Sequence, residues 1–220
     1  MKKVFLSAAD FLGNKAGLTG EDLEVVAYGL EVAFSNLLGL SLALCGGIFL
    51  GNSTEVLTAA LVWLLIRRSA GGAHCKTLWR CVLVSTVSLL TVGKGALWLA
   101  AALDRQLLLP AVALGSAFTL TVMLNRAPAE SPRRPFLAAA RRQYLRRRAI
   151  LTAAILSLLL LGGGFLTANA YGSLLLAAVL GMVTAGIAVT PAGYRLLATV
   201  DFFLDFSGNK IWPGKGGEKE

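Results

Sequence analysis

The chain has 220 residues, of which 56% are hydrophobic and only 15% are charged, and its formal net charge is +9. An average soluble domain is about one quarter charged, so this composition excludes an ordinary soluble protein. The basic residues lie in short segments between long apolar runs. That distribution is typical of cytoplasmic loops of membrane proteins rather than of a nucleic-acid-binding surface. We therefore predict an integral membrane protein without a nucleic-acid partner.

The three cysteines are an odd number, and two of them lie in a segment expected in the cytoplasm. A disulfide framework is therefore not expected. The apolar run after the two N-terminal lysines covers only residues 4–9 and is broken by Asp10. A cleaved signal peptide is not expected either.

The predicted fold class is all-α, a polytopic membrane protein with about six hydrophobic helical segments. Residues 1–18 are expected to form a short helix at the membrane surface, and the next helix begins near Thr19 with acidic residues in its first turn. The second segment has only twelve residues, which is short for a hydrocarbon core about 30 Å thick. The expected spans are residues 37–50, 55–66, 81–102, 107–124, 149–167 and 174–190.

The C-terminal part continues with a predicted amphipathic helix at 194–206 and a polar, glycine-rich tail at 207–220. We take residues 1–206 as one membrane domain and the tail as flexible. Six spans would place both termini and the two basic segments, 67–80 and 125–148, on the cytoplasmic side. Small residues in the last span would let helices pack closely, or two copies pair; they are Ala177, Ala178, Gly181, Ala185 and Gly186.

The segment RRSAGGAHCKTLWRC at 67–81 carries the most reactive chemistry. It holds the only histidine, His74, and two of the three cysteines. Histidine exchanges protons near neutral pH, and a cysteine nucleophile needs such a base because the thiolate is the reactive form. On one continuous helix, His74 and Cys81 would share a face but stand about 10 Å apart along the axis. A Cys–His pair therefore requires a break in the helix.

The residues between them can supply that break. Gly71 and Gly72 give the backbone its freedom to turn, and their amides could approach a substrate carbonyl closely. Thr77 is placed to cap a new helix that carries Cys81 in its first turn, where the helix dipole favours a thiolate. We predict that the helix breaks between Gly71 and Thr77.

From the residues alone, other interpretations stay open. His74 could be a structural polar residue, Cys81 a small apolar residue of a span, and Cys75 a rival nucleophile. A metal site made of these three would lack a fourth ligand and familiar zinc spacing, so no metal is expected.

Charged residues near the spans raise further alternatives. Lys94 lies inside the third span, where it is either functional or a structural residue that reaches the interface or pairs with Glu55. Glu24 and Glu31 share a helix face, and one of them could orient the histidine.

The longest loop, residues 125–148, carries eight arginines. They could bind anionic lipid headgroups, or dock an acidic peptide because arginine pairs with carboxylates through two hydrogen bonds. The candidate peptide-binding residues are Arg133, Arg134, Arg141 and Arg142.

Two motifs resemble those of the AgrB (accessory gene regulator B) family of bacterial membrane cysteine endopeptidases that process quorum-sensing pro-peptides. The first is R-x4-G-x-H-x6-C, formed by Arg67, Gly72, His74 and Cys81. The second is A-P-A-x-x-x-(K/R)-(K/R)-P, at residues 127–135. The order and spacing of the two motifs and the overall length agree with the family's pattern, so the resemblance covers roughly residues 20 to 195. One departure is Leu78, where the family has a small hydroxyl residue four positions after the histidine.

The resemblance implies that Cys81 is a nucleophile and His74 its base. The substrate would be a short AgrD-like pro-peptide with an acidic C-terminal segment, cleaved through a thioester and cyclised to a thiolactone or lactone. Arg67 and the amides of Gly71 and Gly72 would position the substrate or stabilise the oxyanion. No cofactor is expected. A homodimer in the cell membrane is implied, with the site and termini on the cytoplasmic side.

Two other functions remain in competition. The first is a membrane exporter of a small peptide, with His74 and Lys94 as gating or proton-carrying groups. The second is a non-catalytic membrane scaffold that binds acidic partners through the arginine loop.

Overall fold

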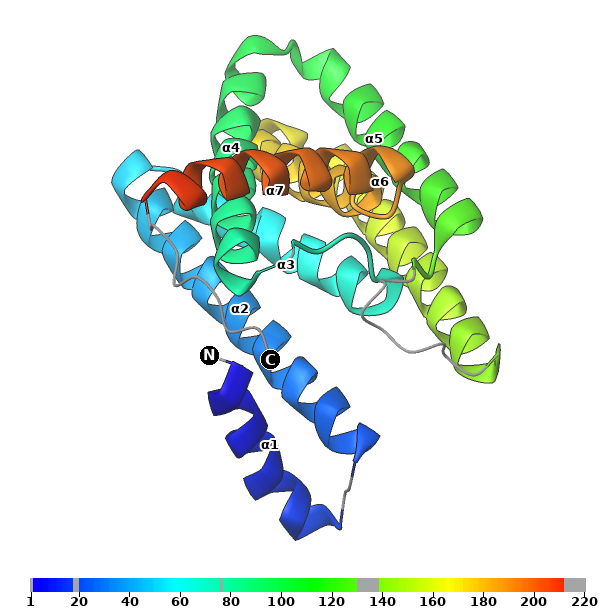
Figure 1. The fold of residues 1–220 in the computed structure, drawn as a ribbon. Helices are drawn as coiled ribbons and strands as arrows, with labels where there is room; N and C mark the ends of the chain where they lie inside the picture. Colours follow the sequence, from blue (N-terminus) through cyan, green and yellow to red (C-terminus); the bar gives the residue numbers. More distant parts are fainter. Residues whose placement is uncertain (1, 18–19, 76, 130–138, 212–220) are drawn as a thin grey trace.

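A computed structural model describes residues 2–17, 20–75, 77–129 and 139–211. Over these ranges the structure is helical, and the one extended pairing is an isolated bridge between Gly71 and Ala129. The predicted all-α fold is confirmed. The helices are α1 (Lys2–Ala16), α2 (Glu21–Leu50), α3 (Ser53–Ala70), α4 (Leu78–Ala102), α5 (Arg105–Arg126), α6 (Ala139–Ile187) and α7 (Pro191–Ile211) (Figure 1).

Helix α6 consists of two segments that fold back on each other. Its backbone is non-helical at Tyr171, with φ −129° and ψ 31°. A Cβ built on Gly164 would lie 3.7 Å from the Leu175 side chain. A straight helix would separate these residues by about 16 Å. The fifth and sixth predicted spans are therefore the two arms of one helical hairpin.

The prediction of about six spans is slightly higher than the structure supports. Among the described residues, four helical segments are long and apolar enough to cross a membrane by themselves. A fifth span results if the pair Tyr171–Ile187 and Pro191–Leu204, bent by 85°, is counted as one. The short second segment lies in α3, which does not meet this criterion. Neighbouring helices bury Val56, Ala59 and Ile66 of α3, so protein replaces lipid around much of it.

The connections between helices gather at two opposite ends of the bundle. At the first, which we call the Glu55 end, Lys94 Nζ donates to the Leu50 carbonyl at 3.1 Å and Ser173 Oγ donates to Glu55 Oε1 at 2.9 Å. At the second, the His74 end, backbone hydrogen bonds join the segments around residues 70–73, 129 and 188. This alternation agrees with the predicted order of the segments.

The second arm of α6 packs its small residues against α3. A Cβ on Gly181 would lie 2.6 Å from the Ala59 carbonyl oxygen, and Ala177, Ala178 and Ala185 are buried. Close helix packing is confirmed, but inside one copy of the chain. This face is therefore not available to pair two copies, contrary to the expectation from sequence.

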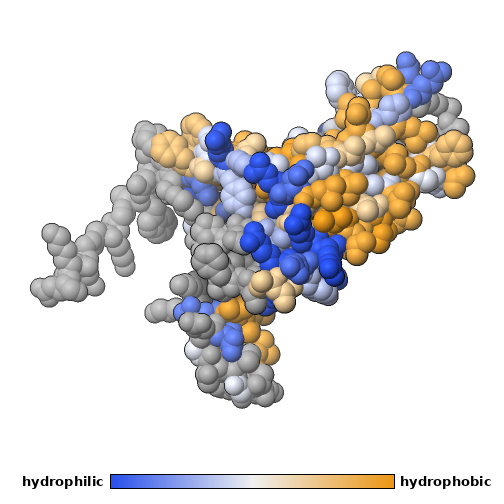
Figure 2. Space-filling model, turned by 90° about the vertical axis from the view of Figure 1, so that its right-hand side faces the viewer, coloured by the Kyte–Doolittle hydropathy of each residue, from blue (hydrophilic) through white to orange (hydrophobic). Residues whose placement is uncertain are grey.

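The outward faces of the helices are apolar. Figure 2 shows a broad hydrophobic surface beside a smaller hydrophilic area. Such an exterior is expected where the surrounding solvent is lipid rather than water. The most exposed large apolar side chains include Phe49, Leu114, Leu158, Phe165 and Leu166.

The chain's two peripheral helices are α1 and α7. Helix α1 packs against the N-terminal half of α2, where the Phe5 and Phe34 ring centroids are 5.8 Å apart. Helix α7 contains the predicted amphipathic segment and passes in front of α4 in Figure 1. It continues to Ile211, so residues 212–220 of the predicted tail lie outside the described residues.

Candidate active site at the His74 end

The helix breaks where the glycines predict. Helix α3 ends at Ala70, and Gly71 and Gly72 follow with φ values of 70° and 123°. Thr77 precedes α4 in an extended conformation, but its side chain makes no capping hydrogen bond. Cys81 is in the first turn of α4, with its amide donating to the Thr77 carbonyl at 3.1 Å. The predicted break is confirmed, whereas a capping role of the threonine hydroxyl is not seen.

Backbone hydrogen bonds hold the segment that carries His74, residues 71–75, which we call the histidine loop. The Ala129 amide donates to the Ala70 carbonyl, and the Ala73 amide donates to the Ala188 carbonyl, each at 2.8 Å. A Cβ on Gly71 would lie 2.6 Å from the Ala129 oxygen. Because Ala129 belongs to the second sequence motif, the two motifs meet in space here.

Gly72 is even more restricted. A Cβ at this position would lie 2.8 Å from the Ala188 oxygen and 3.2 Å from Arg67 Nη1. Its φ of 123° lies in a region that residues with a side chain rarely adopt. Glycine is therefore required both for the turn and for the approach of the arginine.

This loop returns His74 to the cysteine. Nδ1 of His74 lies 3.9 Å from Cys81 Sγ, within the range of a hydrogen bond to sulfur. The imidazole is exposed and Cys81 is half-buried. The structure therefore brings together the two residues that a continuous helix would keep apart.

Arg67 contacts the other side of the imidazole. Its Nη2 lies 3.1 Å from His74 Nε2 and donates to the Ala73 carbonyl at 2.9 Å. The guanidinium also lies over the Trp63 ring, 5.0 Å from the centroid. Since arginine can only donate, Nε2 must accept, and a neutral imidazole then carries its proton on Nδ1, facing the sulfur.

Cys75 is the second cysteine of the 67–81 segment. It is buried, 7% exposed, and its thiol is hydrogen-bonded to Cys81. This hydrogen bond, followed by burial, raises the pKa of Cys75. Cys75 therefore stays a thiol and is a poor nucleophile, but it can donate to a Cys81 thiolate.

The expected amide donors are only partly available. The Gly71 amide donates to the Arg67 carbonyl at 3.0 Å, and the Ala73 amide is occupied by Ala188. Among the described residues of this loop, the Gly72 amide has no protein acceptor. The amide of Gly72 is thus the one of the two predicted glycine donors that remains open.

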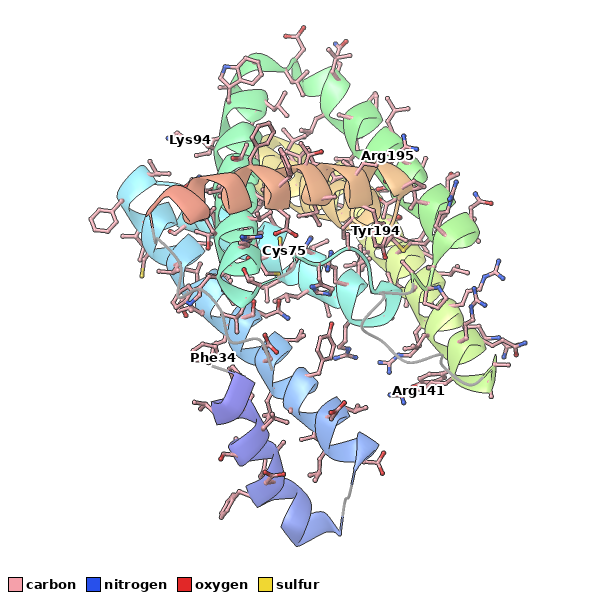
Figure 3. All side chains as sticks on the ribbon, in the orientation of Figure 1. Phe34, Cys75, Lys94, Arg141, Tyr194 and Arg195 are labelled. Carbon is pink, nitrogen blue, oxygen red and sulfur yellow. The ribbon has the colours of Figure 1, made fainter. Side chains whose placement is uncertain are left out.

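The predicted peptide-binding arginines are not part of this cluster. Arg133 and Arg134 lie outside the described residues. Arg141 and Arg142 are exposed on the first turns of α6, and Figure 3 shows Arg141 well away from Cys75. Any acidic segment bound there would lie at some distance from the sulfur.

The other charged candidates are also elsewhere. Lys94 does not pair with Glu55: it donates to the Leu50 carbonyl, while Glu55 accepts from Thr54 and Ser173. In the described part of the chain, neither Glu24 nor Glu31 hydrogen-bonds to His74. No described group of three or more His, Cys, Asp or Glu side chains could hold a metal ion.

The sequence interpretation missed two residues of α7. Asp201 is buried and forms an ion pair with Arg80, with 3.5 Å between Oδ1 and Nη1, next to Cys81 in the chain. Tyr194, labelled in Figure 3, lies within electrostatic range of Arg67. The available signal was an aspartate on the inward face of an amphipathic helix, since residues 194, 197 and 201 share one face.

A comparison with protein families shows which family the chain is from. A family model described as accessory gene regulator B matches residues 7–188. The match covers most of the chain and includes the histidine loop, Cys81 and the Ala129 segment. The chain belongs to the AgrB family. As an AgrB-family protein with several apolar helices, it is a membrane protein of the accessory gene regulator system. The comparisons with curated proteins and with solved structures gave no match.

Proposed function

We propose that this AgrB-family protein is a cysteine endopeptidase of the cell membrane, with its site and termini on the cytoplasmic side. Its substrate would be a short AgrD-like pro-peptide with an acidic C-terminal segment, which it cleaves through a thioester on Cys81. The observation that carries the proposal is the 3.9 Å approach of His74 Nδ1 to Cys81 Sγ. A purely structural histidine would not require the chain to break its helix and fold back.

The contact from Arg67 determines which nitrogen of the neutral imidazole carries its proton. With Nε2 accepting from Arg67, the single imidazole proton is on Nδ1 and points toward the sulfur. A thiolate fits that position as an acceptor, and the guanidinium offsets its charge. The Cys75 thiol is a second donor to the same sulfur.

The first chemical step is attack of the Cys81 thiolate on the scissile carbonyl. A sulfur–carbon bond forms, and the carbonyl π electrons move to the oxygen. The Gly72 amide and Arg67 are the candidate donors for that oxyanion. Collapse of this intermediate breaks the carbon–nitrogen bond, and the leaving nitrogen takes the Nδ1 proton of His74.

For this transfer to leave a neutral histidine, His74 must enter the step as an imidazolium, in which Nε2 carries the proton that the Cys81 thiol gave up. Protonation of Nε2 requires Arg67 to leave it, because the nitrogen then has no lone pair to accept from the arginine. Arg67 therefore orients the imidazole in the resting enzyme and moves to the oxyanion for the attack.

The acyl group then passes from Cys81 to a thiol or hydroxyl within the same peptide. The new bond closes a thiolactone or lactone ring, the proton of that thiol or hydroxyl passes to Nδ1 of His74, and the Cys81 thiolate is released. Exchange of one thioester for another is nearly balanced, whereas formation of a thioester from a peptide bond is uphill. Removal of the leaving fragment therefore drives the reaction, and exclusion of water protects the intermediate.

The exposed arginines of α6 are proposed to hold the acidic segment of the substrate. They include Arg141, Arg142, Arg146, Arg147 and Arg148. Arginine and carboxylate form paired charged hydrogen bonds. A homodimer would have to use a surface other than the small-residue face of α6, which packs on α3.

The test uses purified protein in lipid nanodiscs, incubated with candidate AgrD-like pro-peptides. Wild type, Cys81→Ala, His74→Ala and Cys75→Ala are compared by mass spectrometry of the products. We expect cleavage by wild type and Cys75→Ala only. Cleavage by Cys81→Ala would refute the proposal. Transport of intact peptide into vesicles without cleavage would favour an exporter, and binding without either would favour a scaffold.

A further inference from the structure

Two of the three cysteines have their sulfurs side by side, and the proposed reaction forms a bond to only one of them. Cys81 lies in the first turn of α4, and Cys75 lies six residues earlier, in the histidine loop (Figure 3). The thiol and the backbone amide of Cys75 both hydrogen-bond to the Cys81 sulfur. Both thiols are free. A second, unreacted sulfur is therefore in contact with the proposed nucleophile.

The histidine loop keeps the two sulfurs together. The Ala73 amide donates to the Ala188 carbonyl at 2.8 Å, two residues before Cys75, and the Cys81 amide donates to the Thr77 carbonyl at 3.1 Å. Cys75 is only 7% exposed, so its side chain is directed into the protein, where it contacts Cys81. The sulfurs of a disulfide are about 2 Å apart, a separation that two thiols already in contact reach by a short movement.

The two sulfurs differ in their access to solvent. Cys81 is half-buried beside the exposed imidazole of His74, whereas Cys75 is covered. A small oxidant such as hydrogen peroxide therefore reaches Cys81 first. The thiolate that the proposed function requires at Cys81 is also the form of a cysteine that peroxides oxidise. The fate of an oxidised Cys81 then depends on its neighbour.

The remaining cysteine cannot take the place of Cys75. Cys45 is exposed on α2, and two residues later the Cβ position of Gly47 lies 3.1 Å from Ser53, at the Glu55 end. Cys45 and Cys81 are therefore at opposite ends of the bundle, far beyond the Cα separation of about 7 Å that a disulfide allows.

We propose that Cys75 is a resolving cysteine, which forms a reversible disulfide with Cys81 after a peroxide has oxidised the nucleophile. In the first step an oxygen of the peroxide bonds to Cys81 Sγ, the oxygen–oxygen bond breaks, and the departing hydroxide takes a proton from solvent. The sulfur has lost two electrons and is a sulfenic acid. In the second step Cys75 Sγ bonds to Cys81 Sγ, the sulfur–oxygen bond breaks, and the hydroxide leaves as water with the Cys75 proton.

The disulfide stops cleavage without destroying the site. Its bond uses the electron pair of Cys81 that would attack the peptide carbonyl, and a dithiol restores both thiols by supplying two electrons. Without a neighbouring thiol, further peroxide carries the sulfenic acid to a sulfinic acid, which dithiols do not reduce. This inference rests on the proposed function for the role of Cys81 as the nucleophile.

The disulfide is tested in nanodiscs with excess hydrogen peroxide, followed by denaturation and alkylation with iodoacetamide. Trypsin cleaves after Arg80 and so separates Cys75 from Cys81. We expect mass spectrometry to find these two peptides linked by a disulfide that dithiothreitol reduces, with Cys45 alkylated. A free Cys75 in the treated protein, whether Cys81 is then alkylated or a sulfinic acid, would overturn the inference.

The recovery of cleavage separates a resolving role from hydrogen bonding. Cys75→Ser keeps a donor to Cys81 but cannot form a disulfide, and Cys45→Ser is the control that keeps both sulfurs. For each variant, the cleavage rate after peroxide and then dithiothreitol is divided by its own rate before treatment. We expect this fraction to be at least about fivefold lower in Cys75→Ser than in wild type and Cys45→Ser. Equal fractions in Cys75→Ser and wild type would also overturn the inference.

The outcomes distinguish this inference from the proposed function, because the linked peptides are detected without any cleavage assay. If the disulfide forms but the reduced wild type cleaves no candidate pro-peptide, the proposed function fails and the pairing of Cys75 with Cys81 stands. If the reduced wild type cleaves but Cys75 stays free after oxidation, the peptidase stands and the resolving role of Cys75 fails.

Discussion

The two ends of the bundle both hold polar side chains, but they satisfy them in different ways. At the Glu55 end, Glu55 accepts from two hydroxyl groups and Lys94 donates to a helix carbonyl. At the His74 end, Arg67 and Cys81 contact opposite sides of one imidazole, Cys75 contacts Cys81, and the distance from His74 Nδ1 to Cys81 Sγ is 3.9 Å. Hydrogen bonds that are all formed within the protein, as at the Glu55 end, are typical of a structural role. At the His74 end, among the described residues, the Gly72 amide has no acceptor and the His74–Cys81 contact is long, so both can still interact with a bound substrate.

The largest difference in cleavage rate is expected between two glycine-to-alanine variants, Gly72→Ala at the His74 end and Gly51→Ala at the Glu55 end. Gly72→Ala places a Cβ against the Ala188 carbonyl and Arg67 at a positive φ, so it should displace the histidine loop. We expect peptide cleavage to fall about 100-fold. The measurement is the initial rate in nanodiscs.

Gly51→Ala is the matched control at the Glu55 end. Gly51 also has a positive φ, 67°, but nothing lies within 4 Å of its Cβ position. It should lose about 1–2 kcal/mol of stability from backbone strain and keep its cleavage rate. Equal losses of activity in both variants would show that the two ends are not functionally different.

Arg67→Lys should reduce cleavage roughly tenfold or more. Lysine keeps the charge but lacks the planar donor fork that contacts Nε2 and the Ala73 carbonyl together. Arg68→Lys, on the exposed side of the same turn, should match wild type. A full rate in Arg67→Lys would mean that charge alone is sufficient at this position.

Asp201→Asn tests whether α7 supports the site. The change removes the carboxylate of the ion pair with Arg80, which precedes Cys81, so we expect about 1–3 kcal/mol lower stability and a several-fold lower rate. Thermal unfolding in nanodiscs and the cleavage assay measure these effects. Asp104→Asn, an exposed residue in the turn before α5, is the control and should change neither.

Lys94→Met should have the smallest effect. Lys94 is exposed and makes one hydrogen bond, to the Leu50 carbonyl. We expect a change in cleavage rate of less than about twofold, since such a bond is worth only about 1 kcal/mol. A large loss of activity or transport in this variant would instead favour the exporter.

The sequence predicts the local geometry of the site better than its surroundings. The break between Gly71 and Thr77 follows from the reach of a helix and from two consecutive glycines, and it is present. The contact between Arg67 and Nε2 could not be derived, because it depends on where the loop returns after the break. The same holds for Asp201, which reaches Arg80 only because the chain bends by 85° before α7.

For the fold as well, the sequence predicts some features and not others. Apolar length identifies the long helices, but it cannot show which segment is enclosed by others. Helix α3 can be short and partly polar, since other helices and not lipid cover its residues Val56, Ala59 and Ile66. The small residues of α6 were correctly linked to close packing, yet spacing alone does not say whether the partner is another helix of the same chain or a second copy.

The attachment of the histidine loop has a consequence for biosynthesis. One of its fixed points, Ala188, is at the end of the last hairpin to leave the ribosome. A nascent chain that already exposes its sulfur in the bilayer therefore still lacks the anchor that orients the imidazole. The timing of synthesis would keep an immature chain from attacking peptides before its final helices are inserted.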